Sequence, residues 1–117
     1  MPGSVKPQDR AVEIARAVLA GEIGILEGTR LLVPLLNLDL KIASDEDFNF
    51  LRGVDSETDD LPVGRVRQEW HPDSLPAKDV EIARCENLWG SDVRCACERI
   101  IWRADRTKKE EASEELK

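Results

Sequence analysis

The chain has 117 residues, of which 41% are hydrophobic and 35% charged, and its net charge is −7. This composition predicts a single globular domain with a charged surface and excludes a disordered chain. The sequence pI near 4.8 argues against nucleic-acid binding, because phosphate contacts need clustered Lys and Arg.

Nothing in the sequence predicts export or membrane insertion. The first ten residues, MPGSVKPQDR, contain no apolar segment of the kind found in signal peptides. The longest apolar run, 31–36, has six residues, whereas a membrane span needs about 20. The three cysteines are an odd number, so no disulfide framework is expected. We therefore expect a soluble, cytoplasmic protein without membrane contact.

Two helices are predicted in the first third of the chain. Residues 1–7 hold two Pro and one Gly and are expected to be flexible. Helical spacing of apolar residues predicts one helix over 8–20, ended by Gly21, and a second over 22–36. In the second helix Gly24 and Gly28 share a face and would let another helix approach closely.

Ser44 begins the next predicted helix. It is a favoured N-cap residue and is followed by three acids, which complement the positive end of a helix. We expect Gly53 to end this helix, residues 54–61 to form an ordered loop, and residues 62–70 to form a short helix.

The longest helix is predicted to begin at Ser74 or Leu75 and to run to about residue 104, as one helix or as two broken at Gly90-Ser91. The tail, 105–117, has no apolar face and is expected to be frayed or disordered. The predicted fold is therefore all-α: a compact antiparallel bundle of about four main helices, with short extra helices and a long C-terminal one, spanning residues 8–104.

The acidic side chains are concentrated in one segment. Seven carboxylates and one arginine lie between residues 44 and 60, which gives this segment a charge of −6. Such local acidity indicates a surface for a cationic partner. The predicted partner-binding residues are these acids with one nearby arginine and one tryptophan: Asp45, Glu46, Asp47, Asp55, Glu57, Asp59, Asp60, Arg67 and Trp70.

Other chemistry finds less support in the sequence. The 55–60 segment alternates carboxylates as calcium loops do, but an EF-hand beginning at Asp55 would need Gly and Glu where the chain has Asp60 and Val66. A weak divalent-ion site and a plain turn remain alternatives there. His71 is the single histidine, so a Cys85–His71 pair is the candidate for nucleophilic catalysis. No cofactor motif is present, no metal ligands are assigned, and enzymatic activity stays open.

The cysteines and tryptophans have structural interpretations. Cys95 and Cys97 are two residues apart on a predicted helix and point to different sides, which disfavours a zinc site. All three thiols are therefore interpreted as small buried hydrophobes. Trp89 is predicted to lie in the core, and Trp70 and Trp102 either lie there or serve as binding residues at the surface.

The run GVDSETDDLPVGRVRQEW, with the earlier block AGEIGILEGTR, resembles a signature of small bacterial helical proteins without an assigned activity. The shared elements are Asp55-Ser56-Glu57-Thr58-Asp59, Leu61-Pro62, Gly64, Arg67 and Trp70. The chain is also similar, more weakly, to the immunity proteins of nuclease bacteriocins, which are small, acidic and helical. It has no Tyr, so that family's tyrosine pair cannot be carried over.

These observations lead to three hypotheses. The leading one is a cytosolic protein-interaction module that binds a basic partner, such as a toxin, in the manner of an immunity or antitoxin-like inhibitor. The second is a small metal-binding enzyme or regulator that uses the 55–60 carboxylates. The third is a structural homo-oligomer, for example a homodimer, formed through an exposed stripe of the 76–104 helix.

Overall fold

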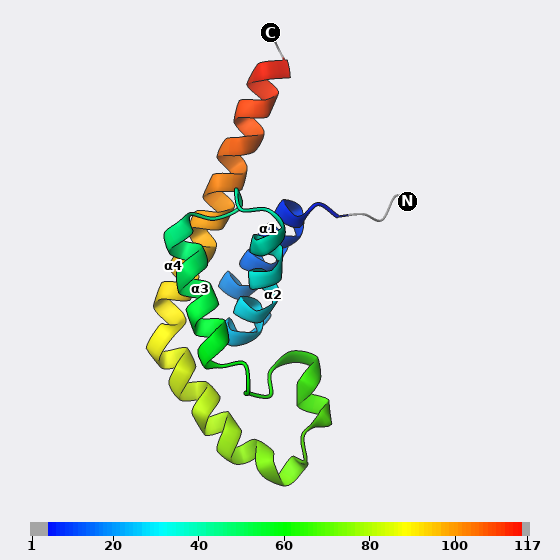
Figure 1. Ribbon diagram of the computed structural model, residues 1–117, viewed down its shortest axis with the longest axis vertical. Coiled ribbons are helices and arrows are strands. Elements are labelled where there is room, and N and C mark those ends of the chain that lie inside the picture. Colours follow the sequence, from blue (N-terminus) through cyan, green and yellow to red (C-terminus); the bar gives the residue numbers. More distant parts are fainter. Residues whose placement is uncertain (1–4, 116–117) are drawn as a thin grey trace.

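The computed structural model describes the backbone of residues 5–115 and the side chains of residues 5–111. Within that range the chain forms four α-helices, α1 (Pro7–Leu19), α2 (Ile25–Leu38), α3 (Asp45–Glu57) and α4 (Leu75–Glu115), and two short 3₁₀ helices, η1 (Gly64–Glu69) and η2 (Pro72–Ser74). The helices run alternately up and down, and α4 passes along the whole bundle and beyond it (Figure 1). The predicted all-α bundle with a long C-terminal helix is confirmed.

The turn between α1 and α2 has the form expected for a glycine after a helix. Gly21 has a φ of +77°, the left-handed conformation that a glycine adopts without a steric cost. The N–H of Glu22 donates to the carbonyl of Ala17 at 2.9 Å, and that of Gly21 donates to Val18 at 3.1 Å. This pair of bonds is the Schellman motif, which ends α1 at the predicted glycine.

Two glycines bring helices into close contact. A Cβ at Gly28 would collide with Val18 of α1, and a Cβ at Gly90 would come within 2.7 Å of Ile25 Cδ1 of α2. The close helix approach predicted for Gly24 and Gly28 is therefore confirmed for Gly28 alone, because Gly24 is the exposed N-cap residue that precedes α2. The glycine in α4 does not break that helix, and its missing side chain instead lets α4 pack against α2.

The main core lies between the four α-helices. Each helix contributes apolar side chains that are almost fully buried: Ala11, Ile14, Ala15, Val18, Leu32, Leu36, Leu51, Val93, Ala96, Cys97 and Ile100. A smaller apolar cluster of Leu26, Val54 and Leu61 continues this core toward the C-terminal end of α3. The core is almost wholly aliphatic, which agrees with the low aromatic content.

The largest differences from the sequence predictions are at the C-terminal ends of α3 and α4, and α2 begins three residues later than predicted, at Ile25. α3 does not end at Gly53 but continues to Glu57, because Val54 buries its side chain in the smaller cluster, so residues 54–57 are helical and not part of a loop. α4 continues to Glu115, so the described part of the charged tail is helical. Residues 1–4 and 116–117 of the predicted flexible ends lie outside the described residues.

Residues 61–74, which we call the connecting arc, join α3 to α4 and carry η1 and η2. The arc swings away from the bundle and returns to the beginning of α4 (Figure 1). Neither η1 nor η2 contains a buried residue. Only the beginning of the arc is anchored in the core, by Leu61 and Pro62, and the part that carries η1 and η2 is attached mainly by polar contacts.

Candidate functional site

The seven acids of the predicted site do not form one patch. Asp45, Glu46 and Asp47 occupy the first turn of α3, whereas the other four acids lie at or after its last turn. A helix of 13 residues is about 18 Å long from first to last residue. The structure therefore divides the acidic segment into two groups at opposite ends of α3.

The group at the N-terminal end serves the fold. Ser44 accepts a hydrogen bond from the N–H of Asp47 at 3.1 Å, which confirms the predicted N-cap. Asp47 does not complete a capping box. Its carboxylate is buried and accepts two bonds of 2.8 Å from the guanidinium of Arg99 on α4, and this bonding raises the pKa of Arg99. Asp47 thus joins α3 to α4 and does not face solvent, whereas Asp45 and Glu46 are exposed.

Arg30 of α2 holds the turn at the other end of α3. Its guanidinium donates to the carbonyls of Thr58 at 2.6 Å, Leu61 at 3.1 Å and Val63 at 3.4 Å. The Thr58 hydroxyl is buried and donates to the carbonyl of Val54 at 2.7 Å. The Arg30 bonds hold three backbone carbonyls of the segment after α3, and so they fix the backbone that leads into the connecting arc.

Asp55 lies beside this turn and is partly buried. Its Oδ1 is 3.9 Å from Nε of Arg30. Burial raises the pKa of the Asp55 carboxyl, Arg30 works in the opposite direction, and the charge of Asp59 adds to the rise. Asp55 is therefore mainly a neighbour of Arg30 and is not freely available to a partner.

The remaining acids of this end are exposed. Glu57, Asp59 and Asp60, which we call the acidic corner, point to solvent. Among the residues whose side chains are described, none forms an ion pair with these three. The charges of Asp60 and Glu57 also act on Cys85, so the corner lies close to α4.

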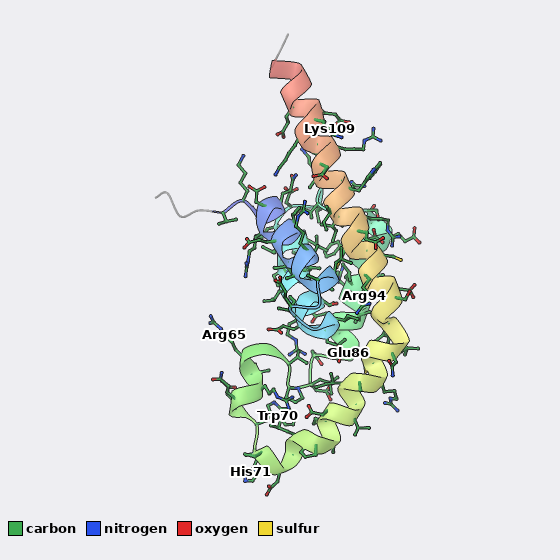
Figure 2. All side chains as sticks on the ribbon, turned by 180° about the vertical axis from the view of Figure 1, so that it is seen from behind. Arg65, Trp70, His71, Glu86, Arg94 and Lys109 are labelled. Carbon is green, nitrogen blue, oxygen red and sulfur yellow. The ribbon has the colours of Figure 1, made fainter. Side chains whose placement is uncertain are left out.

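The two other predicted binding residues have contacts within the chain. Arg67 forms two hydrogen bonds with Asp79 of α4, at 2.7 and 2.9 Å, and donates to the carbonyl of Pro62 at 3.4 Å. Trp70 is half-buried, and the ammonium of Lys78 lies 5.6 Å from the centre of its ring. The side chain of Trp70 lies on the side of the arc that faces α4, whereas the side chain of Arg65 points away from the molecule (Figure 2).

A small cavity that is open to solvent lies beside these contacts, between α2, the arc and α4. The cavity has a volume of about 200 Å³ and is lined by Glu27, Val63, Arg67, Ile82 and Glu86 among others. Pockets for small molecules usually measure about 300 to 1,000 Å³. Arg67 is already neutralised by Asp79 at this place, so the cavity presents no free cation to an anionic ligand.

The arrangement gives little support to catalysis or metal binding. Cys85 lies ten residues into α4, about 15 Å along the axis from its beginning, while His71 precedes η2 and its Nδ1 accepts a bond from the N–H of Asp73. Burial raises the pKa of Cys85, which disfavours the reactive thiolate. In the part of the chain with described side chains, no three His, Cys, Asp or Glu residues converge as metal ligands.

Cysteine and tryptophan positions correct part of the sequence interpretation. Cys97 is buried, and burial raises its pKa to about 12, while Cys85 is half-buried. Cys95 is exposed, so only part of the expected burial of the thiols is observed. Trp102 is also exposed, which corrects its interpretation as a core residue. Helical spacing in the sequence indicates both exposures, because Cys95 and Trp102 lie on the side of the helix opposite the buried Val93 and Ile100.

No family model matches this chain, and neither a curated protein nor a solved structure matches it. Among the described helices, none combines the length and the apolar character that a membrane span requires. The charges and contacts of the chain itself are therefore the basis for assigning a function.

Proposed function

We propose that the chain is a protein-interaction module that binds a basic partner through the acidic corner. The observation that carries this proposal is that Glu57, Asp59 and Asp60 form an exposed group, without an ion-pair partner among the described side chains, on a turn that Arg30 holds in place. A fixed backbone lowers the entropy that would otherwise be lost on binding. Exposed charges increase the rate of encounter with a partner of opposite charge.

The position of the acidic corner supports a role outside folding. Acids are favourable at the N-terminal end of a helix and unfavourable at its C-terminal end, where the helix dipole is negative. α3 has no basic residue in its last turn, and the guanidinium of Arg30 at this end contacts Asp55 and backbone carbonyls and not these three acids. The three carboxylates therefore add nothing to the stability of α3, and a binding partner gives them a physical function.

The most concrete form of the proposal follows the resemblance to immunity proteins. In this form the partner is a basic toxin, and the acidic corner occupies a positively charged surface that the toxin needs for its activity. Long-range attraction predicts that the association rate falls steeply as salt rises, while the dissociation rate changes little.

A pull-down from the lysate of the source cell, at low and high salt, tests the proposal. The test variant is Glu57→Gln/Asp59→Asn/Asp60→Asn, and the matched control is Asp45→Asn/Glu46→Gln, which neutralises exposed acids at the other end of α3. We expect a basic protein to be retained by the wild type and the control at low salt, and to be lost from the test variant and at high salt.

The purified partner then allows stopped-flow measurement of association at several salt concentrations. An association rate that does not depend on salt, or equal binding by the test variant and the wild type, would contradict the proposed role of the acidic corner.

A further inference from the structure

α4 carries a row of exposed apolar side chains on the face that points away from the bundle. Leu88, Cys95 and Trp102 follow one another at intervals of seven residues, so they lie in one row along the helix. Leu88 is 66% exposed, Trp102 is 58% exposed, and Cys95 is exposed as well. Val93 and Ile100, on the opposite side of α4, are fully buried in the core. We call these three exposed residues the outer stripe.

The outer stripe is arranged symmetrically about Cys95. Leu88 precedes Cys95 by seven residues, and Trp102 follows it by seven. In an antiparallel pair of α4 helices with Cys95 on the two-fold axis, Leu88 of each copy lies opposite Trp102 of the other. A two-fold interface is self-complementary in this way, because each contact occurs twice.

Charged residues beside the outer stripe fit the same arrangement. Asp92 and Arg99 lie on one flank of the stripe, and Arg94 and Glu98 lie on the other. An antiparallel pair brings the same flank of each copy together. Asp92 then lies close to Arg99 of the second copy, and Glu98 lies close to Arg94 of the second copy. Arg99 is bound to Asp47, yet 55% of its side chain stays exposed and available to this contact.

The C-terminal part of α4 favours the antiparallel direction over the parallel one. Arg106 and Lys109 lie on the same side of α4 as the stripe and are exposed. A parallel pair would place these cations of the two copies side by side, whereas an antiparallel pair moves them to opposite ends. In the antiparallel pair, Arg84 still approaches Arg106 of the second copy, and these two cations repel each other. Glu81 lies one turn from Arg84, where its negative charge offsets this repulsion.

We propose that two copies of this chain associate through the outer stripe of α4, antiparallel, with Cys95 on the two-fold axis. The association removes the exposed leucine and tryptophan of both copies from water, and this burial of apolar surface contributes favourably to the free energy of association. The proposal does not depend on the function of the acidic corner, which lies on a different element.

The mass in solution is the first test. Light scattering across a range of protein concentrations should give twice the 13.2 kDa of one chain at the upper end. Leu88→Asp and Trp102→Asp should each give the mass of one chain at the same concentrations. Leu38→Asp is the matched control, because Leu38 is 74% exposed on α2 and should leave the dimer intact. A wild-type mass of one chain throughout, or an unchanged mass for Leu88→Asp, overturns the proposal.

The direction of the pair is tested by disulfide trapping in a Cys95→Ser background. One chain carries Leu88→Cys and a differently tagged chain carries Trp102→Cys, and the mixture is oxidised with copper–phenanthroline. We expect disulfides mainly between the two different chains. Disulfides mainly within pairs of the same variant would indicate parallel helices and overturn the antiparallel arrangement. Cys95→Ser alone controls for Cys85 and Cys97 and should stay uncrosslinked.

Discussion

At the N-terminal end of α3, Asp45, Glu46 and Asp47 lie next to free backbone N–H groups, whereas at the C-terminal end Glu57, Asp59 and Asp60 lie next to carbonyls. The first group stabilises the helix, and Asp47 also binds Arg99. The second group opposes the helix dipole and has no ion-pair partner among the described residues. The same kind of side chain therefore contributes to folding at one end of α3 and is available for recognition at the other.

The largest effect should come from Asp47. The change Asp47→Ala removes two charge-assisted hydrogen bonds from Arg99 and leaves a buried space, so we expect the free energy of unfolding to fall by about 2 to 3 kcal/mol. Asp45→Ala, which truncates an exposed acid in the same turn, should cost less than about 1 kcal/mol. Urea denaturation measures both, and equal losses would mean that the bond to Arg99 adds nothing.

Arg30 should be the residue on which the C-terminal end of α3 depends most. Arg30→Met keeps much of the apolar part of the side chain but removes bonds to three carbonyls, and we expect a loss of about 2 kcal/mol. Arg65→Met is the control, because Arg65 is exposed and points away from the molecule (Figure 2). Urea denaturation of both variants makes the comparison, and a loss for Arg65→Met as large as for Arg30→Met would contradict the anchoring role of Arg30.

The N-cap should have an intermediate effect. Ser44→Ala removes the acceptor for the N–H of Asp47, and we expect thermal and urea unfolding to show a loss of about 1 kcal/mol. Ser56→Ala, at an exposed position in the last turn of α3, should change stability by less than about 0.5 kcal/mol. Equal effects at the two serines would show that the cap bond does not contribute to stability.

Neutralising the acidic corner should have a small effect of the opposite sign. Glu57→Gln/Asp59→Asn/Asp60→Asn removes repulsion at the negative end of α3, so we expect the free energy of unfolding to rise by about 0.5 kcal/mol. Asp45→Asn/Glu46→Gln should lower it by a similar amount. Both differences should shrink at high salt, because the side chains are exposed. A clear loss of stability in the triple variant would mean that the carboxylates of the acidic corner stabilise the fold, which would contradict this expectation.

The smallest effect concerns Asp55 and pH. Burial raises the pKa of its carboxyl in the folded chain above the usual value for an aspartate. Between the usual and the raised pKa the folded chain binds more protons than the unfolded one, so this group lowers stability as the pH rises through that range. Asp55→Asn should remove this slope and raise the free energy of unfolding at neutral pH by less than about 0.5 kcal/mol. Urea denaturation at a series of pH values measures the slope, and a steeper one in the variant would contradict this assignment.

The sequence predicted the helices and Ser44 as the N-cap because apolar spacing and capping chemistry are local signals. It missed the end of α3, because Gly53 is a weak helix former and its cost is offset by the burial of Val54, which depends on the smaller cluster. Trp102, for which both a core and a surface position were considered, is exposed, and its place on the helix opposite Val93 and Ile100 is the signal that favours the surface position.

The sequence predicted which residues belong to the candidate site, but it did not predict how they are arranged in space. All seven acids lie in the acidic segment, yet their separation into two groups follows only from the continuation of α3 to Glu57. The partners of Asp47 and Asp55, which are Arg99 and Arg30, lie far away in the sequence, and no local pattern marks such pairs. The bonds of Arg67 to Asp79 were missed in the same way.

The connecting arc has a consequence for how this molecule opens. Its 3₁₀ helices bury no residue, and its attachment to the rest of the chain includes the bonds made by Arg30 and by the pair of Arg67 and Asp79. Such a segment detaches locally at a lower free energy than global unfolding requires. Amide protons of residues 64–74 should therefore exchange with solvent while those of α1 and α2 stay protected, and this arc is where the chain should best tolerate an inserted peptide or a proteolytic cut.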